Sequence, residues 1–94
     1  MPNYVIEREI PGAGKFSSDD LQQISRKSCD ILDGMGTHIQ WIHSYVTDDK
    51  IYCVYRADSV ELIRRHAAAG GFPANSIAEI RAVIDPTTAE PVAA

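Results

Sequence analysis

The chain has 94 residues and a formal net charge of −4, with 9 Lys and Arg against 13 Asp and Glu. A chain of this length forms one small domain. Its hydrophobic fraction of 45% and charged fraction of 23% are those of a globular protein, which excludes disordered and collagen-like classes. The acidic balance and scattered basic residues argue against nucleic-acid binding, since phosphates require clustered positive charge.

Targeting and cysteine signals are weak. No apolar run approaches the roughly 18 residues of a membrane span, and no apolar block follows a basic start, so we expect a cytoplasmic protein without a membrane partner. Cys29 and Cys53 have no CxxC spacing, which favours reduced thiols over a disulfide or zinc motif.

The N-terminal segment predicts a strand followed by a helix. Residues 3–10 place Tyr4, Ile6 and Ile10 on one side and acidic residues on the other, as in a half-buried strand. After a Pro-Gly break, Ser17 and the acids behind it provide a cap for a helix that ends near Gly34. Its apolar stripe recurs at helical spacing: Leu21, Ile24, Ser28, Ile31, Leu32 and Met35.

A hairpin is predicted next, with strands at 37–46 and 51–56 joined by a turn at 47–50. We expect Val46 to face Ile51, a register that a single bulge would change. The further pairs in this register are Tyr45 with Tyr52, Ser44 with Cys53, His43 with Val54 and Ile42 with Tyr55.

The C-terminal part predicts a second helix and a fourth strand. Asp58 and Glu61 resemble a capping box for a helix that Gly70 and Gly71 end. Residues 77–84 then alternate as a strand, with alanines and isoleucines at even positions facing the core. We expect a domain over residues 1–85 and a loose tail over 86–94.

This β-α-β-β-α-β order predicts an α+β, ferredoxin-like fold, with a four-stranded antiparallel sheet and both helices on one face. Aromatic and charged side chains are expected together on the other face, which favours a homodimer interface there. The residues expected on that face are Glu7, Glu9, Trp41, His43, Tyr45, Tyr52, Arg56, Glu79 and Arg81.

Histidines and carboxylates on this face suggest a divalent metal site, because imidazole and carboxylate ligands suit nickel, zinc or copper. The candidate ligands are His43, His38, His66, Glu7 and Glu9. His38 and His43 point to opposite faces of a regular strand, so sharing one ion requires a bulge or a second subunit. Alternatively, His43 hydrogen-bonds across a dimer interface and His66 packs in the core.

Catalytic motifs are not evident. Cys53 has no histidine on its side of the expected hairpin, and Gly12 to Lys15 lacks the spacing of a phosphate-binding loop. We therefore assign no catalytic residue and do not favour an enzyme.

Three segments resemble one family: residues 4–15, the hairpin at 40–55, and residues 66–75 with their Gly-Gly-Phe-Pro-Ala-Asn run. The chain is similar over about residues 1–84 to small nickel-binding proteins long known only as a domain of unknown function. The resemblance implies a ferredoxin-like dimer that binds nickel at its surface, with sequestration or detoxification as the role. The ligand set given above follows from residue types and is not transferred from the family.

Two further hypotheses stay open. The first is a small-molecule enzyme of the dimeric α+β barrel type, an isomerase or cofactor-independent monooxygenase, since one fold supports many functions. Its pocket would be lined by Trp41, Tyr45, Tyr52, Arg56 and Cys53. The second is an interaction domain with no small-ligand site.

Overall fold

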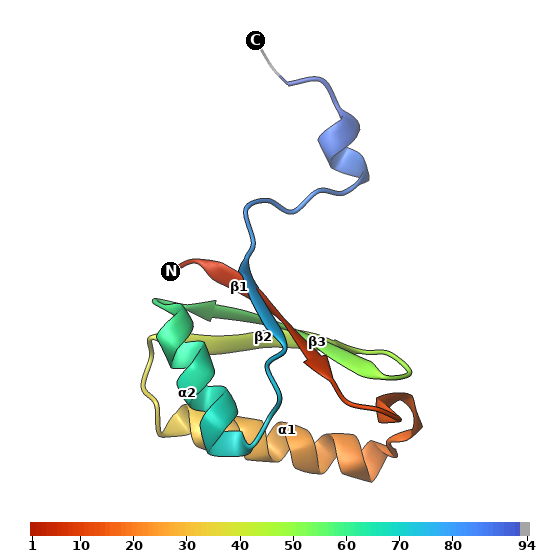
Figure 1. Ribbon diagram of the computed structural model, residues 1–94. Coiled ribbons are helices and arrows are strands. Elements are labelled where there is room, and N and C mark those ends of the chain that lie inside the picture. Colours follow the sequence, from red (N-terminus) through yellow and green to blue (C-terminus); the bar gives the residue numbers. More distant parts are fainter. Residues whose placement is uncertain (93–94) are drawn as a thin grey trace.

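The computed structural model describes residues 1–92 and has a ferredoxin-like α+β architecture. Its sheet has four antiparallel strands in the order β2-β3-β1-β4, and Figure 1 shows both helices on the same side of it. This confirms the predicted fold. The elements are β1 (Asn3–Glu9), η1 (Ala13–Lys15), α1 (Ser18–Asp33), β2 (Ile39–Val46), β3 (Lys50–Ala57), α2 (Val60–Gly70), β4 (Ser76–Glu79) and η2 (Pro86–Ala89).

Strand β1 lies in the middle of the sheet and determines which side chains face the helices. Tyr4, Ile6 and Arg8 alternate along it and are all buried. Tyr4 pairs with Tyr55 and Ile6 with Cys53 on β3. The core therefore lies between these two strands and the helices, and the opposite side of the sheet, here called the open face, is uncovered.

Helix α1 begins as predicted. Ser17 accepts a hydrogen bond from the backbone N–H of Asp20, and the Asp20 carboxylate accepts one from the backbone N–H of Ser17, which completes a capping box. The apolar stripe is less buried than expected, because Ser28 is the only buried residue of α1.

The hairpin register is as predicted from Val46 to His43, but a β-bulge interrupts it between Trp41 and His43. Ile42 is the extra residue, so Trp41 rather than Ile42 faces Tyr55. A bulge reverses the alternation of the residues beyond it. Trp41 therefore lies on the helix-covered side, where it packs against the core, and its predicted place on the open face is wrong.

The start of α2 also differs from the prediction. The N-cap residue is Ser59 and makes no side-chain capping bond, so Asp58 and Glu61 do not form a capping box. Asp58 instead lies 2.5 Å from the ring of His38. The helix ends as expected at Gly71, whose φ of 67° lies in the left-handed region.

Strand β4 is shorter than predicted and has the opposite alternation. It spans only four residues, and Ile77 pairs with Ile6 while Ala78 pairs with Val5. Ile77 thus faces the helices and Ala78 the open face. Glu79 pairs with Tyr4 on the helix-covered side and forms an ion pair with the exposed Arg81, so its predicted place on the open face is wrong.

The C-terminal segment leaves the sheet after β4 and extends away from the domain (Figure 1). It contains one short turn of helix, η2, which Asp85 caps through Thr87 and Thr88. The predicted tail thus has some regular structure, and its last two residues lie outside the described range. Among residues 1–92, neither helix has the length and apolar character needed to cross a membrane.

Candidate metal site on the open sheet face

His43 lies on the open face of edge strand β2, where its side chain is exposed. Its ring packs edge-on against Tyr45, with ring centroids 5.0 Å apart. No hydrogen bond to either ring nitrogen is formed within residues 1–92, so both nitrogens are accessible to a ligand.

His38 precedes β2 and forms a pair with Asp58, whose Oδ2 lies 2.5 Å from Nδ1. A carboxylate on one ring nitrogen orients the imidazole and leaves the other nitrogen, Nε2, as a possible metal ligand. The His38 side chain is exposed in the bend that precedes β2. The bulge at Ile42 puts Gln40 and His43 on the same side of β2, so the regular alternation expected from His38 to His43 is interrupted.

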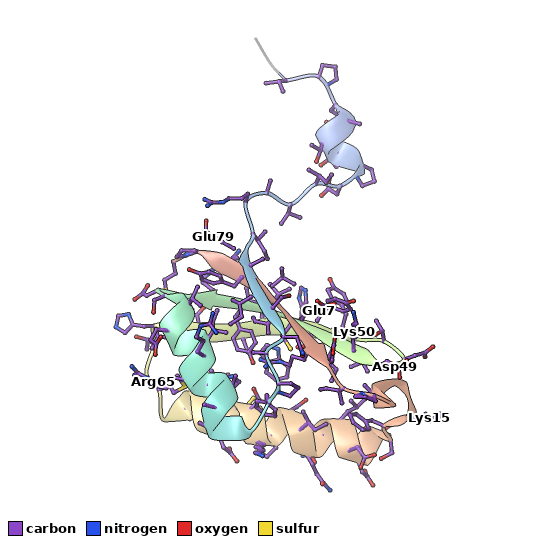
Figure 2. All side chains as sticks on the ribbon, in the orientation of Figure 1. Glu7, Lys15, Asp49, Lys50, Arg65 and Glu79 are labelled. Atoms are coloured by element: carbon purple, nitrogen blue, oxygen red, sulfur yellow. The ribbon has the colours of Figure 1, made fainter. Side chains whose placement is uncertain are left out.

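Glu7 lies near the centre of the open face, and its carboxylate is already bound within the chain. Lys50 Nζ donates to Glu7 Oε1 over 2.7 Å, and Ser76 Oγ donates to Oε2 over 3.4 Å. Figure 2 shows Glu7 and Lys50 side by side. The ammonium of Lys50 lowers the pKa of Glu7, so the carboxylate stays anionic. A metal that binds Oε1 would compete with Lys50 for it.

Glu7, Glu9 and His43 lie on the open face but do not converge within one chain. Glu7 is on β1 and His43 on β2, with β3 between them, so they are separated by about 9.5 Å of sheet. His38 and His43 lie about 13 Å apart along the strand. Glu9 is exposed at the end of β1. Among residues 1–92, no three His, Cys, Asp or Glu side chains are grouped as a metal site.

His66 lies on the other side of the sheet and is completely buried. Ser28 Oγ lies 3.1 Å from its Nε2, and the hydroxyl of Tyr55 lies 3.5 Å from Nδ1. Burial, reinforced by the positive charge of Arg8, lowers the pKa of His66, although the bond to Ser28 opposes the shift. The reading of His66 as a packed core residue is therefore correct, and it cannot join His43 in one site.

The alternative pocket is also divided by the sheet. Trp41 and Cys53 face the helices, whereas Tyr45, Tyr52 and Arg56 belong to the open face. Arg56 is exposed and donates to Asn3 Oδ1 over 3.2 Å. These five residues do not line one pocket.

Sequence reasoning missed Arg8, the one buried arginine among the described residues. Arg8 lies two residues after Ile6 and four after Tyr4, so it is on the same buried side of the strand. A charged residue at such a position was the signal that the sequence offered. Arg8 lines a cavity of about 460 Å³ between the sheet and the helices, together with Trp41 and Cys53. A pocket does exist there, on the side of the sheet away from His43.

Comparisons with known proteins found a matching family model and a similar solved structure. A family model described as "Nickel responsive protein SCO4226-like" matches residues 4–80. Among solved structures, SCO4226 from Streptomyces coelicolor A3(2) is similar, with a TM-score of 0.73 and 18% sequence identity over 87% of this chain and 99% of that one. At this identity the likeness supports the fold alone. No curated protein matches the chain.

Proposed function

Because the chain belongs to the family of SCO4226-like nickel responsive proteins, we propose that it binds Ni²⁺ on the open face of its sheet. The observation that carries this proposal is the position of His43, which is exposed on the uncovered face and whose ring nitrogens form no hydrogen bond within residues 1–92. Imidazole nitrogens and carboxylate oxygens are ligands that Ni²⁺ accepts. His43 is the principal ligand in this proposal.

A second copy of the chain completes the site. A metal bonds histidine nitrogens at about 2.1 Å, and within residues 1–92 no three His, Cys, Asp or Glu side chains of one chain are grouped closely enough to hold one ion. A two-fold dimer duplicates each histidine and can bring copies of His43 together. The open face has a suitable surface, since Tyr45, which pairs with Tyr52 there, is 60% exposed. Dimerisation is therefore part of the proposal.

Glu7 and Glu9 are secondary ligands. The carboxylate of Glu7 is anionic near neutral pH, since Lys50 lowers its pKa, but this ion pair competes with metal binding. Glu9 is free of ion pairs within the described residues and lies at the end of β1. A role in sequestering or detoxifying nickel in the cytoplasm belongs to the same proposal.

Calorimetric titration of the tag-free, metal-free protein with Ni²⁺, Zn²⁺, Co²⁺ and Cu²⁺ tests the proposal. We expect saturable Ni²⁺ binding with a stoichiometry set by the dimer, and at least a tenfold loss of affinity in His43→Ala. Acidification to about pH 5 should also weaken binding, because protonated imidazole cannot ligate.

The matched control is Gln40→Ala, which removes another exposed open-face side chain from the same strand. It should bind Ni²⁺ like the unmodified protein. Equal affinities in His43→Ala and Gln40→Ala, or no saturable binding at all, would exclude His43 as the principal ligand.

A further inference from the structure

The helix-covered side of the sheet contains a cavity of about 460 Å³, within the range of small-molecule sites in proteins. Leu21 and Ile24 face it from α1, and Trp41, Val46 and Ile51 face it from the hairpin. The helix residues Leu21 and Ile24 are only half-buried. The first turns of α1 therefore stand off the sheet instead of filling the space beneath them.

Arg8 contributes an incompletely bonded cation to this cavity. The residue is only 3% exposed. Its Nε donates to Cys53 Sγ over 3.3 Å and its Nη1 donates to the carbonyl oxygen of Pro73 over 2.6 Å, but Nη2 has no hydrogen-bond partner. Phe72 covers the guanidinium, whose Cζ lies 5.6 Å from the ring centroid.

No carboxylate compensates this charge. Among residues 1–92, none lies within ion-pair distance of Arg8. A guanidinium cannot lose its proton in a protein, so its buried charge is unfavourable until an anion neutralises it. Nη2 is therefore an unused donor on a residue that lines the cavity.

The other polar side chains of the wall are mainly hydroxyl groups, which can donate as well as accept hydrogen bonds. Ser28, Ser44 and Tyr55 present hydroxyl groups, and burial raises the pKa of Tyr55, so its phenol stays protonated. Lys27 stands at the same cavity, with its ammonium 5.6 Å from the Phe72 ring centroid. Glu9 is the one acidic residue of the wall, and it is exposed. The cavity thus combines an apolar body with a donor-rich, positively charged end.

We propose that this cavity binds a small monocarboxylic acid with an apolar body, whose carboxylate pairs with the Arg8 guanidinium. The apolar part lies between Leu21 and Ile24 of α1 and the hairpin. One guanidinium with one unused nitrogen suits a single carboxylate, to which arginine forms short charge-assisted hydrogen bonds. The site is separate from the proposed principal nickel ligand His43, which lies on the opposite side of the sheet; Glu9 at the end of β1 borders both.

Octanoate is the test ligand and 1-octanol is its uncharged counterpart. Calorimetric titration should give saturable octanoate binding at least tenfold tighter than octanol binding, and octanoate should raise the melting temperature. Arg8→Met replaces the buried charge by an apolar side chain, a change that proteins often tolerate without loss of stability. In this variant, octanoate affinity should fall at least tenfold while octanol affinity stays the same or increases.

Ile24→Trp provides a second test that leaves Arg8 intact. The larger side chain fills the cavity from α1 and should abolish binding of both ligands, whereas Gln23→Trp on the exposed side of the helix should have no effect. The proposal is wrong if octanoate fails to bind, binds no better than octanol, or keeps its affinity in Arg8→Met or Ile24→Trp. A Ni²⁺ titration of the same variants should be unchanged, so the outcome is independent of the metal proposal.

Discussion

The buried imidazole of His66 shows how one residue links the two helices to the sheet. It comes from α2, lies 3.1 Å from Ser28 of α1 through Nε2, and packs beside Tyr55 of β3 with ring centroids 5.3 Å apart. Phe72 covers its other side, with ring centroids 5.6 Å apart. A neutral imidazole suits this environment, because a buried charge next to Arg8 would be unfavourable.

His66 should therefore make stability depend on pH. Its pKa in the folded protein lies below 6.5, mainly because of burial, whereas the unfolded chain has the ordinary value. Below about pH 6.5 the unfolded state binds a proton that the folded state does not, so stability falls as pH decreases toward the folded pKa. Urea unfolding between about pH 7.5 and 5 should show this loss, and His66→Gln should reduce it.

Measurements on two variants check that prediction. His66→Gln should also lower the free energy of unfolding by about 1–3 kcal/mol at pH 7.5, since the buried hydrogen bonds are imperfectly replaced. The exposed His43→Gln should keep both the stability and the pH dependence of the unmodified protein. A pH dependence that is identical in His66→Gln would show that other groups cause it.

At the residue scale, sequence patterns predicted the exposed candidates better than the buried ones. The open-face positions of Glu7, His43 and Tyr45 follow from strand alternation and are found there. The buried position of Arg8 was missed, since a cation at a core position contradicts the usual preference for apolar residues. The ionic partner Lys50 of Glu7 depends on cross-strand register, which alternation alone does not determine.

At the scale of elements, the loop between β1 and α1 is held against the hairpin turn by backbone contacts. The backbone N–H of Gly14 donates to the carbonyl of Asp48 over 3.0 Å, and that of Gly12 donates to Asp49 Oδ1 over the same distance. A Cβ at Gly14 would lie 2.8 Å from Cα of Asp48. The glycine-rich loop at residues 12–15 thus packs against the hairpin turn.

Gly14→Ala should separate this loop from the turn and lower the free energy of unfolding by about 1–3 kcal/mol, as overpacking against backbone typically does. Gly34→Ala is the control, because its added Cβ would meet only the carbonyl oxygen of Ile31 at an ordinary 3.5 Å. Thermal and urea unfolding should separate the two variants. Equal stabilities would mean that the loop moves away from the hairpin at little cost.

The element order, both helices and the hairpin register next to the turn could be predicted because they depend on local periodicity, caps and turn residues. The bulge at Ile42 could not, since strand alternation does not show where an extra residue is inserted. The end of β4 after Glu79 was also unpredictable. Residues 80–84 continue the alternating pattern, but only partner strand β1, which begins at Asn3, decides how many of them pair.

At the scale of the whole molecule, the sheet divides the chain into two chemically different sides. The open face holds His43 and Glu7, and the helix-covered side holds the Arg8 cavity and His66. The two proposals can therefore be tested independently. The proposed metal site also depends on assembly. Residues 1–92 of one chain contain no group of three His, Cys, Asp or Glu ligands, whereas a symmetric pair of chains would provide twice as many ligands.

The most direct test is a crystal structure of the nickel-loaded protein, with anomalous diffraction recorded at the nickel absorption edge. We predict an anomalous peak on the open face, about 2.1 Å from a ring nitrogen of His43, in an interface with a second copy of the chain. A peak beside Cys53 or Glu9 without His43, or one bound to a single chain far from β2, would contradict the account.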